Sequence, residues 1–314
     1  MSITEMLGIQ YPILSGAMMR IATHELVGAV SEAGGLGVLG SAGLSAEQLR
    51  AEIRATRQLT DKPFGVNLML QMKNCPELAQ VIIDEGVKVV TTGAGNPTSY
   101  IPPLHAAGIK VMPVIASVHH AHKMVAAGAD ALVAEGQESG GHIGQTSTMA
   151  LLPQVVDAVD IPVIGAGGVG DGRSIAAMFA LGAQGVQCGT IFLTAEECPV
   201  PASYKQRVLA ASDTDTIVTG RSQRDPVRAL TNPMLAQYLQ LEQTNAPVAE
   251  LHALADGSFA KAVEDGDMEH GTPMAGEVAG MMTTIRPVKE IITDLFSQAK
   301  AVVAQLKIEW KQSG

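Results

Sequence analysis

The stretch "IPVIGAGGVGDGRSIAAMFALGAQGVQCGT" (residues 161–190) contains a complete strand–helix–strand pattern. An apolar run at 161–168 is followed by a segment with helical spacing, which opens at Asp171 and stops at Gly182, and then by a second apolar run at 185–190. Short apolar runs that alternate with capped helices are typical of parallel α/β units. The stretch therefore predicts a β–α–β unit with glycines directly after each strand.

Six earlier runs rich in Val and Ile repeat this unit toward the N-terminus, each followed by a segment with helical spacing. They lie at 11–16, 36–40, 63–70, 87–93, 110–116 and 129–136. The helix predicted at 45–60 opens on Ser45 with Gln48 three residues later, which is a capping box. Eight strands alternating with helices predict a (β/α)8 TIM barrel. A doubly wound sheet usually carries a glycine fingerprint after its first strand, and "SGAMMR" is no such fingerprint.

The repeat stops after the eighth run. Residues 195–284 are polar and have no strand pattern of the earlier kind, whereas 287–310 regains helical periodicity. We therefore expect an α/β protein in which 1–194 and 285–314 form the barrel and 195–284 forms a helical cap inserted after strand eight. The cap is expected to serve as the substrate domain.

Composition and charge exclude several classes of function. The chain has 31 acidic and 21 basic residues and a formal charge of −10, which argues against non-specific binding to nucleic acid or anionic membrane. Its three cysteines are an odd number without zinc spacing, so we expect neither a disulfide framework nor a structural metal. We expect the protein to work in a reducing compartment. The first residues lack a signal-peptide pattern, and no uncharged apolar run reaches about 18 residues. We expect a cytoplasmic protein.

Glycine-rich segments follow the last two strands of the predicted barrel. "GAGGVGDG" (165–172) and "QCGT" (187–190) can both present backbone N–H groups to an anion at the carboxyl ends of the strands, where barrel active sites lie. The alternative is that these glycines only allow tight turns. The pairing of the two segments favours a phosphate. The small residues of "SGAMM", "TTGAGNP" and "EGQESGGHIG" would leave room for a flat ring such as a flavin.

His142 is the candidate catalytic residue. It follows the sixth strand, and glycines at 140, 141 and 144 would let its loop fold closely over a flat ligand. Imidazole can donate a proton or a hydrogen bond near neutral pH, as is needed where a substrate carbonyl becomes enolate-like. The alternative is an ordinary surface or core histidine.

Other reactive side chains have simpler interpretations. A thiol nucleophile is one reading of Cys188, but it lies inside the proposed phosphate turn without a local base, so we predict a packing residue. Asp171 is predicted to cap a helix. The spacing of His119, His120 and His122 lacks the i, i+4 pair of a helical zinc site, which predicts surface residues.

Taken together, the motifs resemble one family. They are "YPILSGAMMRIA", "DKPFGVNLML", "EGVKVVTTGAGNP", "VAEGQESGGHIG", "IPVIGAGGVGDG", "GVQCGT" and "MAGEVAG". The chain resembles the FMN-dependent enoyl-acyl-carrier-protein reductase II family (FabK type), within the nitronate monooxygenase (2-nitropropane dioxygenase-like) superfamily. "GGHxG" and "GAGG…GT" are shared across the superfamily, whereas "VKVVTTGAGNP" and "MAGxxAG" favour the reductase.

The resemblance implies a homodimeric flavoenzyme of bacterial type II fatty-acid synthesis. NADH or NADPH would reduce FMN, and hydride would then pass to a trans-2-enoyl thioester carried by acyl-carrier protein. His142 would polarise the thioester carbonyl. The residues implied for FMN are Gly167, Gly168, Cys188 (through its backbone), Gly189 and Thr190 at the phosphate, and Ala17, Met18, Asn67, Glu135 and Gln187 around the ribityl chain and ring. A monovalent cation held by loop carbonyls near "MAGEVAG" is also known in the family.

The sequence also allows two alternative functions, and it suggests candidates for a docking surface. A nitronate monooxygenase would share the barrel, FMN and histidine, but reduced flavin would react with oxygen and a nitronate. A flavin-storing or phosphate-binding barrel would have no turnover. Since acyl-carrier protein is acidic, docking would need a local basic patch. The candidates are Lys205, Arg207, Arg221, Arg224 and Arg228.

Overall fold

Eight parallel strands form a closed ring. The structure, a computed structural model, describes residues 2–306. The strands follow the order β1-β9-β8-β6-β5-β4-β3-β2, and Ser15 and Leu36 close the ring because the Ser15 N–H donates to the Leu36 carbonyl (3.0 Å). This confirms the predicted (β/α)8 barrel. Each predicted run contains one strand: β1 (Ile13–Ser15), β2 (Gly37–Gly40), β3 (Phe64–Met69), β4 (Val89–Gly93), β5 (Lys110–Ile115), β6 (Leu132–Glu135), β8 (Val163–Ala166) and β9 (Gly185–Cys188).

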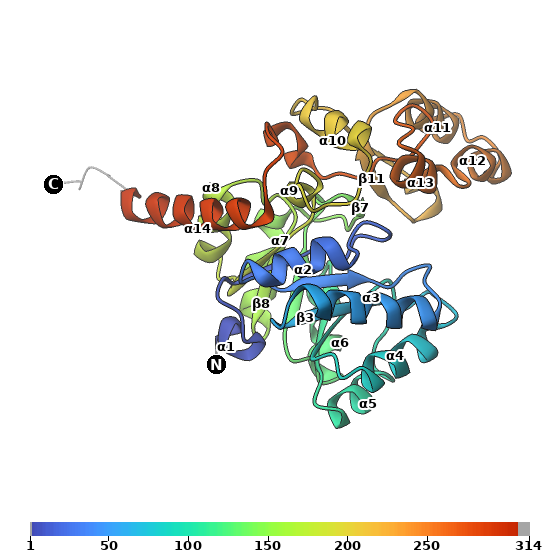
Figure 1. Cartoon of the computed structure of the whole chain (residues 1–314). Coiled ribbons are helices and arrows are strands. Elements are labelled where there is room, and N and C mark those ends of the chain that lie inside the picture. The colour runs from blue at the N-terminus through green and yellow to red at the C-terminus, as the bar shows by residue number, and fades with distance from the viewer. Residues whose placement is uncertain (1, 307–314) are drawn as a thin grey trace.

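Helices cover the outside of the ring and begin where the sequence predicts (Figure 1). Ser45 caps α3 and its hydroxyl accepts from the Gln48 N–H, while the Asp171 carboxylate caps α8 and accepts from the Arg173 N–H at 2.8 Å. The helices are α1 (Ile3–Leu7), α2 (His24–Glu32), α3 (Ala46–Leu59), α4 (Cys75–Asp84), α5 (Ile101–Ala106), α6 (Val118–Ala126), α7 (Thr148–Ala158), α8 (Gly172–Ala180), α9 (Thr190–Leu193) and α14 (Val288–Gln305). The last of these packs along α8, as Figure 1 shows. The part of this predicted helix from residue 307 onward lies outside the described residues.

The interior of the barrel is apolar at one end and polar at the other. Val38, Val89 and Val133 belong to a buried cluster inside the ring, and α1 closes the amino-terminal end because Ile3 and Leu7 join the same cluster. Side chains alternate across a strand, so residues two positions further along each strand face the same interior at its carboxyl end. The amino-terminal end of the described barrel is therefore filled, and the carboxyl-terminal mouth is where this fold places a site.

The segment after β9 is mainly helical, as expected, but it also contains two strands that the sequence did not predict. Strands β10 (Thr216–Thr219) and β11 (Val227–Leu230) form an antiparallel pair, and β11 also pairs with β7 (Gly141–His142) from the barrel loop. These strands are short and half polar, which hides their period from a sequence reading. The remaining elements are α10 (Ala202–Leu209), η1 (Arg221–Gln223), α11 (Pro233–Gln243), α12 (Val248–Ala255), α13 (Ser258–Ala260), η2 (Lys261–Asp265) and η3 (Glu277–Met281).

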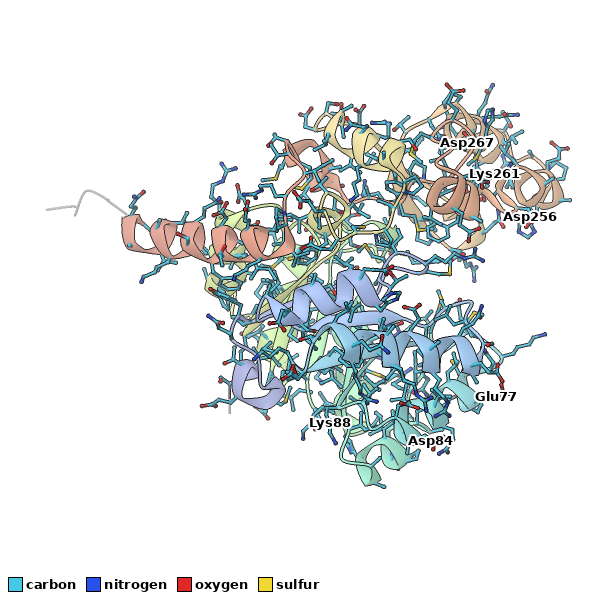
Figure 2. All side chains as sticks on the ribbon, in the orientation of Figure 1. Glu77, Asp84, Lys88, Asp256, Lys261 and Asp267 are labelled. Atoms are coloured by element: carbon cyan, nitrogen blue, oxygen red, sulfur yellow. The ribbon has the colours of Figure 1, made fainter. Side chains whose placement is uncertain are left out.

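Charged side chains lie on the outside of both parts. Figure 2 shows Glu77, Asp84 and Lys88 projecting from the barrel side, and Asp256 and Lys261 projecting from the cap, and all five are exposed. Among the helices of residues 2–306, none combines the length and the apolar character needed to cross a membrane.

Candidate active site

Polar side chains form a ring at the mouth of the barrel. Val133 faces the interior, so Glu135 faces it as well, and the same alternation turns Asn67, Thr91 and Gln187 inward from their strands. The Asn67 Nδ2 donates a hydrogen bond to the Thr91 Oγ1 at 2.8 Å. Asn67, Glu135 and Gln187 were predicted from the resemblance. Thr91 was missed, although the two-residue period from Val89 pointed to it.

Glu135 is a carboxyl group with an unusual protonation. The residue as a whole is partly exposed, but its carboxyl group is surrounded by protein and is poorly solvated. This burial raises the pKa of Glu135 to about 7. Near neutral pH the group can therefore either donate or accept a hydrogen bond at the mouth. Carboxyl groups perturbed by burial in this way are common in functional sites.

The glycine turns after β8 and β9 can receive an anion. Gly167 and Gly168 have φ of +88° and +80°, a conformation that favours glycine. In the described part of the chain, the backbone N–H groups of Gly168, Gly189 and Thr190 donate to no protein acceptor. The Thr190 hydroxyl accepts from the Gly276 N–H at 2.8 Å, which leaves its own proton free to donate. These donors suit the oxygens of a phosphate.

Gly93 leaves open space at the end of β4. A Cβ atom built there would meet no heavy atom within 4 Å, and the residue does not have the positive φ that requires glycine. At Gly189 the nearest atom to such a Cβ is the Met18 Sδ, at 3.7 Å. Neither backbone conformation nor protein packing explains glycine at these two positions. The absence of side chains therefore fits a flat group lying over the mouth.

His142 is held by the cap. It lies on β7, where it pairs with Val227 of β11, and the next N–H, from Ile143, donates to the Pro226 carbonyl at 3.0 Å. Its Nε2 lies 3.2 Å from the Oδ1 of Asp225, and these side chains are 50% and 65% exposed. The predicted catalytic histidine is thus placed beside an acidic residue that sequence reasoning missed, because no local motif links the two.

The glycines beside His142 serve contacts within the protein. A Cβ on Gly140 would lie 2.6 Å from the carbonyl carbon of Ala275, and one on Gly144 would lie 2.7 Å from the Cβ of Ala116. The Glu277 N–H donates to the Glu138 carbonyl at 3.0 Å along the same contact. The sequence reading attributed these glycines to a close approach of a ligand, whereas Gly140 is where the "MAGEVAG" segment packs against the loop.

Gly140→Ala is expected to lower the free energy of unfolding by about 1–3 kcal/mol, the usual cost of overpacking. The added methyl would meet backbone atoms of Ala275 and Gly276, which cannot rotate away as a side chain could. Thermal unfolding followed by circular dichroism measures the change. An unchanged melting temperature would show that the loop and the "MAGEVAG" segment do not pack as the structure has them.

Cys188 does not face the mouth. It belongs to the buried cluster between the strands and the helices, and burial raises the pKa of its thiol to about 12. A neutral, inaccessible thiol is a poor nucleophile. The geometry therefore supports the predicted packing role for the side chain, and leaves only its backbone near the phosphate turn.

Three of the five residues of the predicted basic patch are engaged within the protein. Lys205 and Arg228 are buried, and Arg207 is largely covered, so these cannot form a docking surface. Their hydrogen bonds join parts of the cap and the loop: Lys205 Nζ to the Ala195 carbonyl (2.6 Å), Arg207 Nη2 to the Thr231 carbonyl (2.9 Å) and Arg228 Nε to the Gln137 carbonyl (3.1 Å). Arg221 and Arg224 are exposed. The patch as predicted is wrong.

The remaining candidates do not involve the polar ring of the mouth. His119, His120 and His122 are exposed on α6, as predicted. Within residues 2–306, no group of three His, Cys, Asp or Glu side chains is arranged to hold a metal ion. A groove of about 590 Å³ lies between the loops that follow β2 and β3, but none of the predicted site residues lines it. The mouth, with its glycines and polar ring, therefore remains the candidate site.

Comparisons with known proteins agree on the kind of barrel. The chain matches the family model described as nitronate monooxygenase over residues 1–80 and 77–298. The structure of FabK from Thermotoga maritima is 46% identical, with a TM-score of 0.94 over 96% of this chain and 97% of that chain. A (3aS,4S,5R,7aS)-5-hydroxy-7a-methyl-1-oxo-octahydro-1H-indene-4-carboxyl-CoA dehydrogenase from Rhodococcus jostii (strain RHA1) is 42% identical over 74% of this chain and 66% of that relative. A probable nitronate monooxygenase from Staphylococcus aureus (strain MSSA476) is 31% identical over 96% of this chain and 98% of that relative.

Proposed function

The chain belongs to the nitronate monooxygenase family, and within it we propose that the protein is an FMN-dependent reductase of trans-2-enoyl thioesters, of the FabK type. The observation that carries the proposal is the 46% identity to FabK over 96% of the chain, which includes the cap as well as the barrel. The family model and the similarity to FabK support the coarser statement, a flavin-type oxidoreductase.

The residues of the mouth fit FMN. Gly168, Gly189 and Thr190 would hold the phosphate with unpaired donors, beside Gly167 and the backbone of Cys188. The residues that would surround the ribityl chain and ring are Ala17, Met18, Asn67, Gly93, Glu135 and Gln187. When bound, FMN would supply hydride transfer from NADH or NADPH to the β-carbon of the enoyl thioester.

His142 would act on the thioester carbonyl. As the β-carbon gains hydride, negative charge develops on the carbonyl oxygen, and a donor placed there stabilises the transition state more than the ground state. His142 lies on the loop that follows β6 with its ring half-exposed, which leaves it accessible to a substrate. Its backbone is fixed by pairing with β11, so the ring is presented from a rigid element.

A thioester substrate is favoured by the named relatives. The resemblance to the FabK type implies thioesters of acyl-carrier protein as substrates, and the Rhodococcus jostii relative is by its name a carboxyl-CoA dehydrogenase. The identities to these two proteins exceed the 31% identity to the probable nitronate monooxygenase. Nitronate oxidation with oxygen is the second candidate, because that relative covers 96% of the chain.

An anaerobic absorption experiment tests the choice. We expect NADH or NADPH to bleach the flavin of the purified protein, and crotonyl-CoA to restore the colour. Butyryl-CoA, which lacks the double bond, is the matched control and should restore nothing. If crotonyl-CoA fails, and propyl nitronate drives oxygen consumption in a separate assay in air, the protein is a nitronate monooxygenase. If neither substrate reacts, the barrel only binds flavin.

We propose further that the enzyme works as a homodimer in the cytoplasm and takes its enoyl chains from acyl-carrier protein. A monovalent cation near "MAGEVAG" belongs to the same proposal, as does the division into a barrel of 1–194 and 285–314 and a cap of 195–284. The exposed Arg221 and Arg224 are the part of the predicted patch that an acidic carrier can reach.

A further inference from the structure

An acidic residue of the cap faces the candidate catalytic histidine. The Asp225 Oδ1 lies 3.2 Å from the His142 Nε2, across the pairing of β11 with β7. We propose that Asp225 is a positioning residue, which orients the ring of His142 and holds a proton on Nε2, so that Nδ1 is the nitrogen presented to the substrate. The role in catalysis rests on the function proposed above, whereas the pairing itself does not.

The turn that carries Asp225 is anchored to α11. Glu242 accepts from the Gly220 N–H at 3.0 Å, and from both the N–H (3.0 Å) and the hydroxyl (2.6 Å) of Ser222. The Asp225 N–H donates back to the Gly220 carbonyl at 3.0 Å, which closes the turn. A Cβ on Gly220 would lie 2.2 Å from the Asp225 carbonyl oxygen, so the turn tolerates no side chain there. The backbone of Asp225 is thus fixed relative to the cap.

A second anchor holds the other side of the turn. The Gln223 Nε2 donates to the Tyr238 hydroxyl at 3.0 Å, and its Oε1 lies 2.9 Å from the His252 Nε2. The residue after Asp225 is Pro226, whose carbonyl accepts from the Ile143 N–H, next to His142. The backbone on both sides of the Asp225–His142 contact is therefore held by backbone bonds and by side chains of α11 and α12.

The chemistry of the pair assigns the two ring nitrogens. An ionised carboxylate can only accept, so the nitrogen that faces it carries a proton. With Nε2 paired with Asp225 at 3.2 Å, Nδ1 is the ring nitrogen left to donate to a thioester carbonyl. A carboxylate that orients a histidine serves in the same way in acyl-transfer triads.

The test compares Asp225→Asn with Asp213→Asn in the FMN-loaded enzyme. Both variants remove one exposed carboxylate from the cap, but only the first faces His142. We expect Asp225→Asn to lower kcat for crotonyl-CoA between about twofold and tenfold, since exposed ion pairs are weak and the site becomes drier with substrate bound. The KM, the FMN content and bleaching by the nicotinamide cofactor should stay unchanged. Asp225→Glu should recover much of the loss, and Asp213→Asn should behave as wild type.

A second readout does not depend on activity. Long-range ¹H–¹⁵N spectra of histidine-labelled protein report which ring nitrogen carries a proton, with His142→Gln used to assign the signal. We expect a protonated Nε2 at His142 in the wild type and an altered pattern in Asp225→Asn. Unaltered His142 signals, or a kcat loss equal to that of Asp213→Asn, would overturn the proposal. If the wild type reduces no enoyl thioester, the proposed function fails, and the spectra still decide whether Asp225 sets the tautomer.

Discussion

His142→Ala is expected to lower kcat for enoyl thioester reduction by about 10² to 10⁴-fold, the range supplied by a positioned proton or hydrogen-bond donor. No other histidine of residues 2–306 lies on the β7 loop, and the ring is open to a substrate. The flavin should remain bound, because the proposed phosphate donors belong to the turns after β8 and β9. Stopped-flow absorption separates the two half-reactions: bleaching by the nicotinamide cofactor should persist, whereas recolouring by crotonyl-CoA should slow.

His119→Ala is the matched control for this variant. His119 is exposed on α6, a different element from the loop that carries His142, so its removal should leave both half-reactions unchanged. A fall of less than about threefold in kcat for His142→Ala would contradict general acid–base catalysis by this residue. Loss of FMN from His142→Ala would show that the loop supports the cofactor, and that its effect on turnover is indirect.

Gly93→Val is expected to weaken FMN binding while leaving the fold intact. The protein offers this side chain open space, so folding should be unaffected, but a ring lying over β4 would collide with it. Overpacking of about 1–3 kcal/mol corresponds to a Kd for FMN raised about 5- to 150-fold. Fluorescence titration of the apoprotein with FMN measures the Kd, and calorimetry of the apoprotein checks its stability.

A glycine on the other side of the barrel provides the comparison. Gly86 lies between α4 and β4, and a Cβ there also meets nothing within 4 Å, so Gly86→Asn tests a substitution in open space away from the mouth. Asparagine tolerates the positive φ of this residue. Gly86→Asn should bind FMN as the wild type does. Unchanged FMN affinity in Gly93→Val would place the ring elsewhere.

The barrel could be predicted because its signals are local. Each strand is a run of apolar residues within a few positions, and the caps at Ser45 and Asp171 act on the next three residues. Gly167, Gly168 and Gly189 directly follow the ends of β8 and β9 in the sequence, so the position of the mouth could be predicted from the sequence alone. Asn67, Glu135 and Gln187 face the interior because the strand period is two.

The cap and the surroundings of His142 depend on contacts between residues far apart in the chain. The sequence named His142, but its neighbour Asp225, its pairing with β11 and the packing of Gly140 against Ala275 arise only when the cap folds back onto the barrel loop. The sequence also does not show which charged side chains are exposed, since Arg228 is buried and Arg224 is exposed although both are arginines of the same segment. Periodicity and capping act over a few residues, whereas burial and pairing are set by which distant surfaces meet. That is why the chain specified the barrel and its histidine, and folding determined what holds that histidine in place.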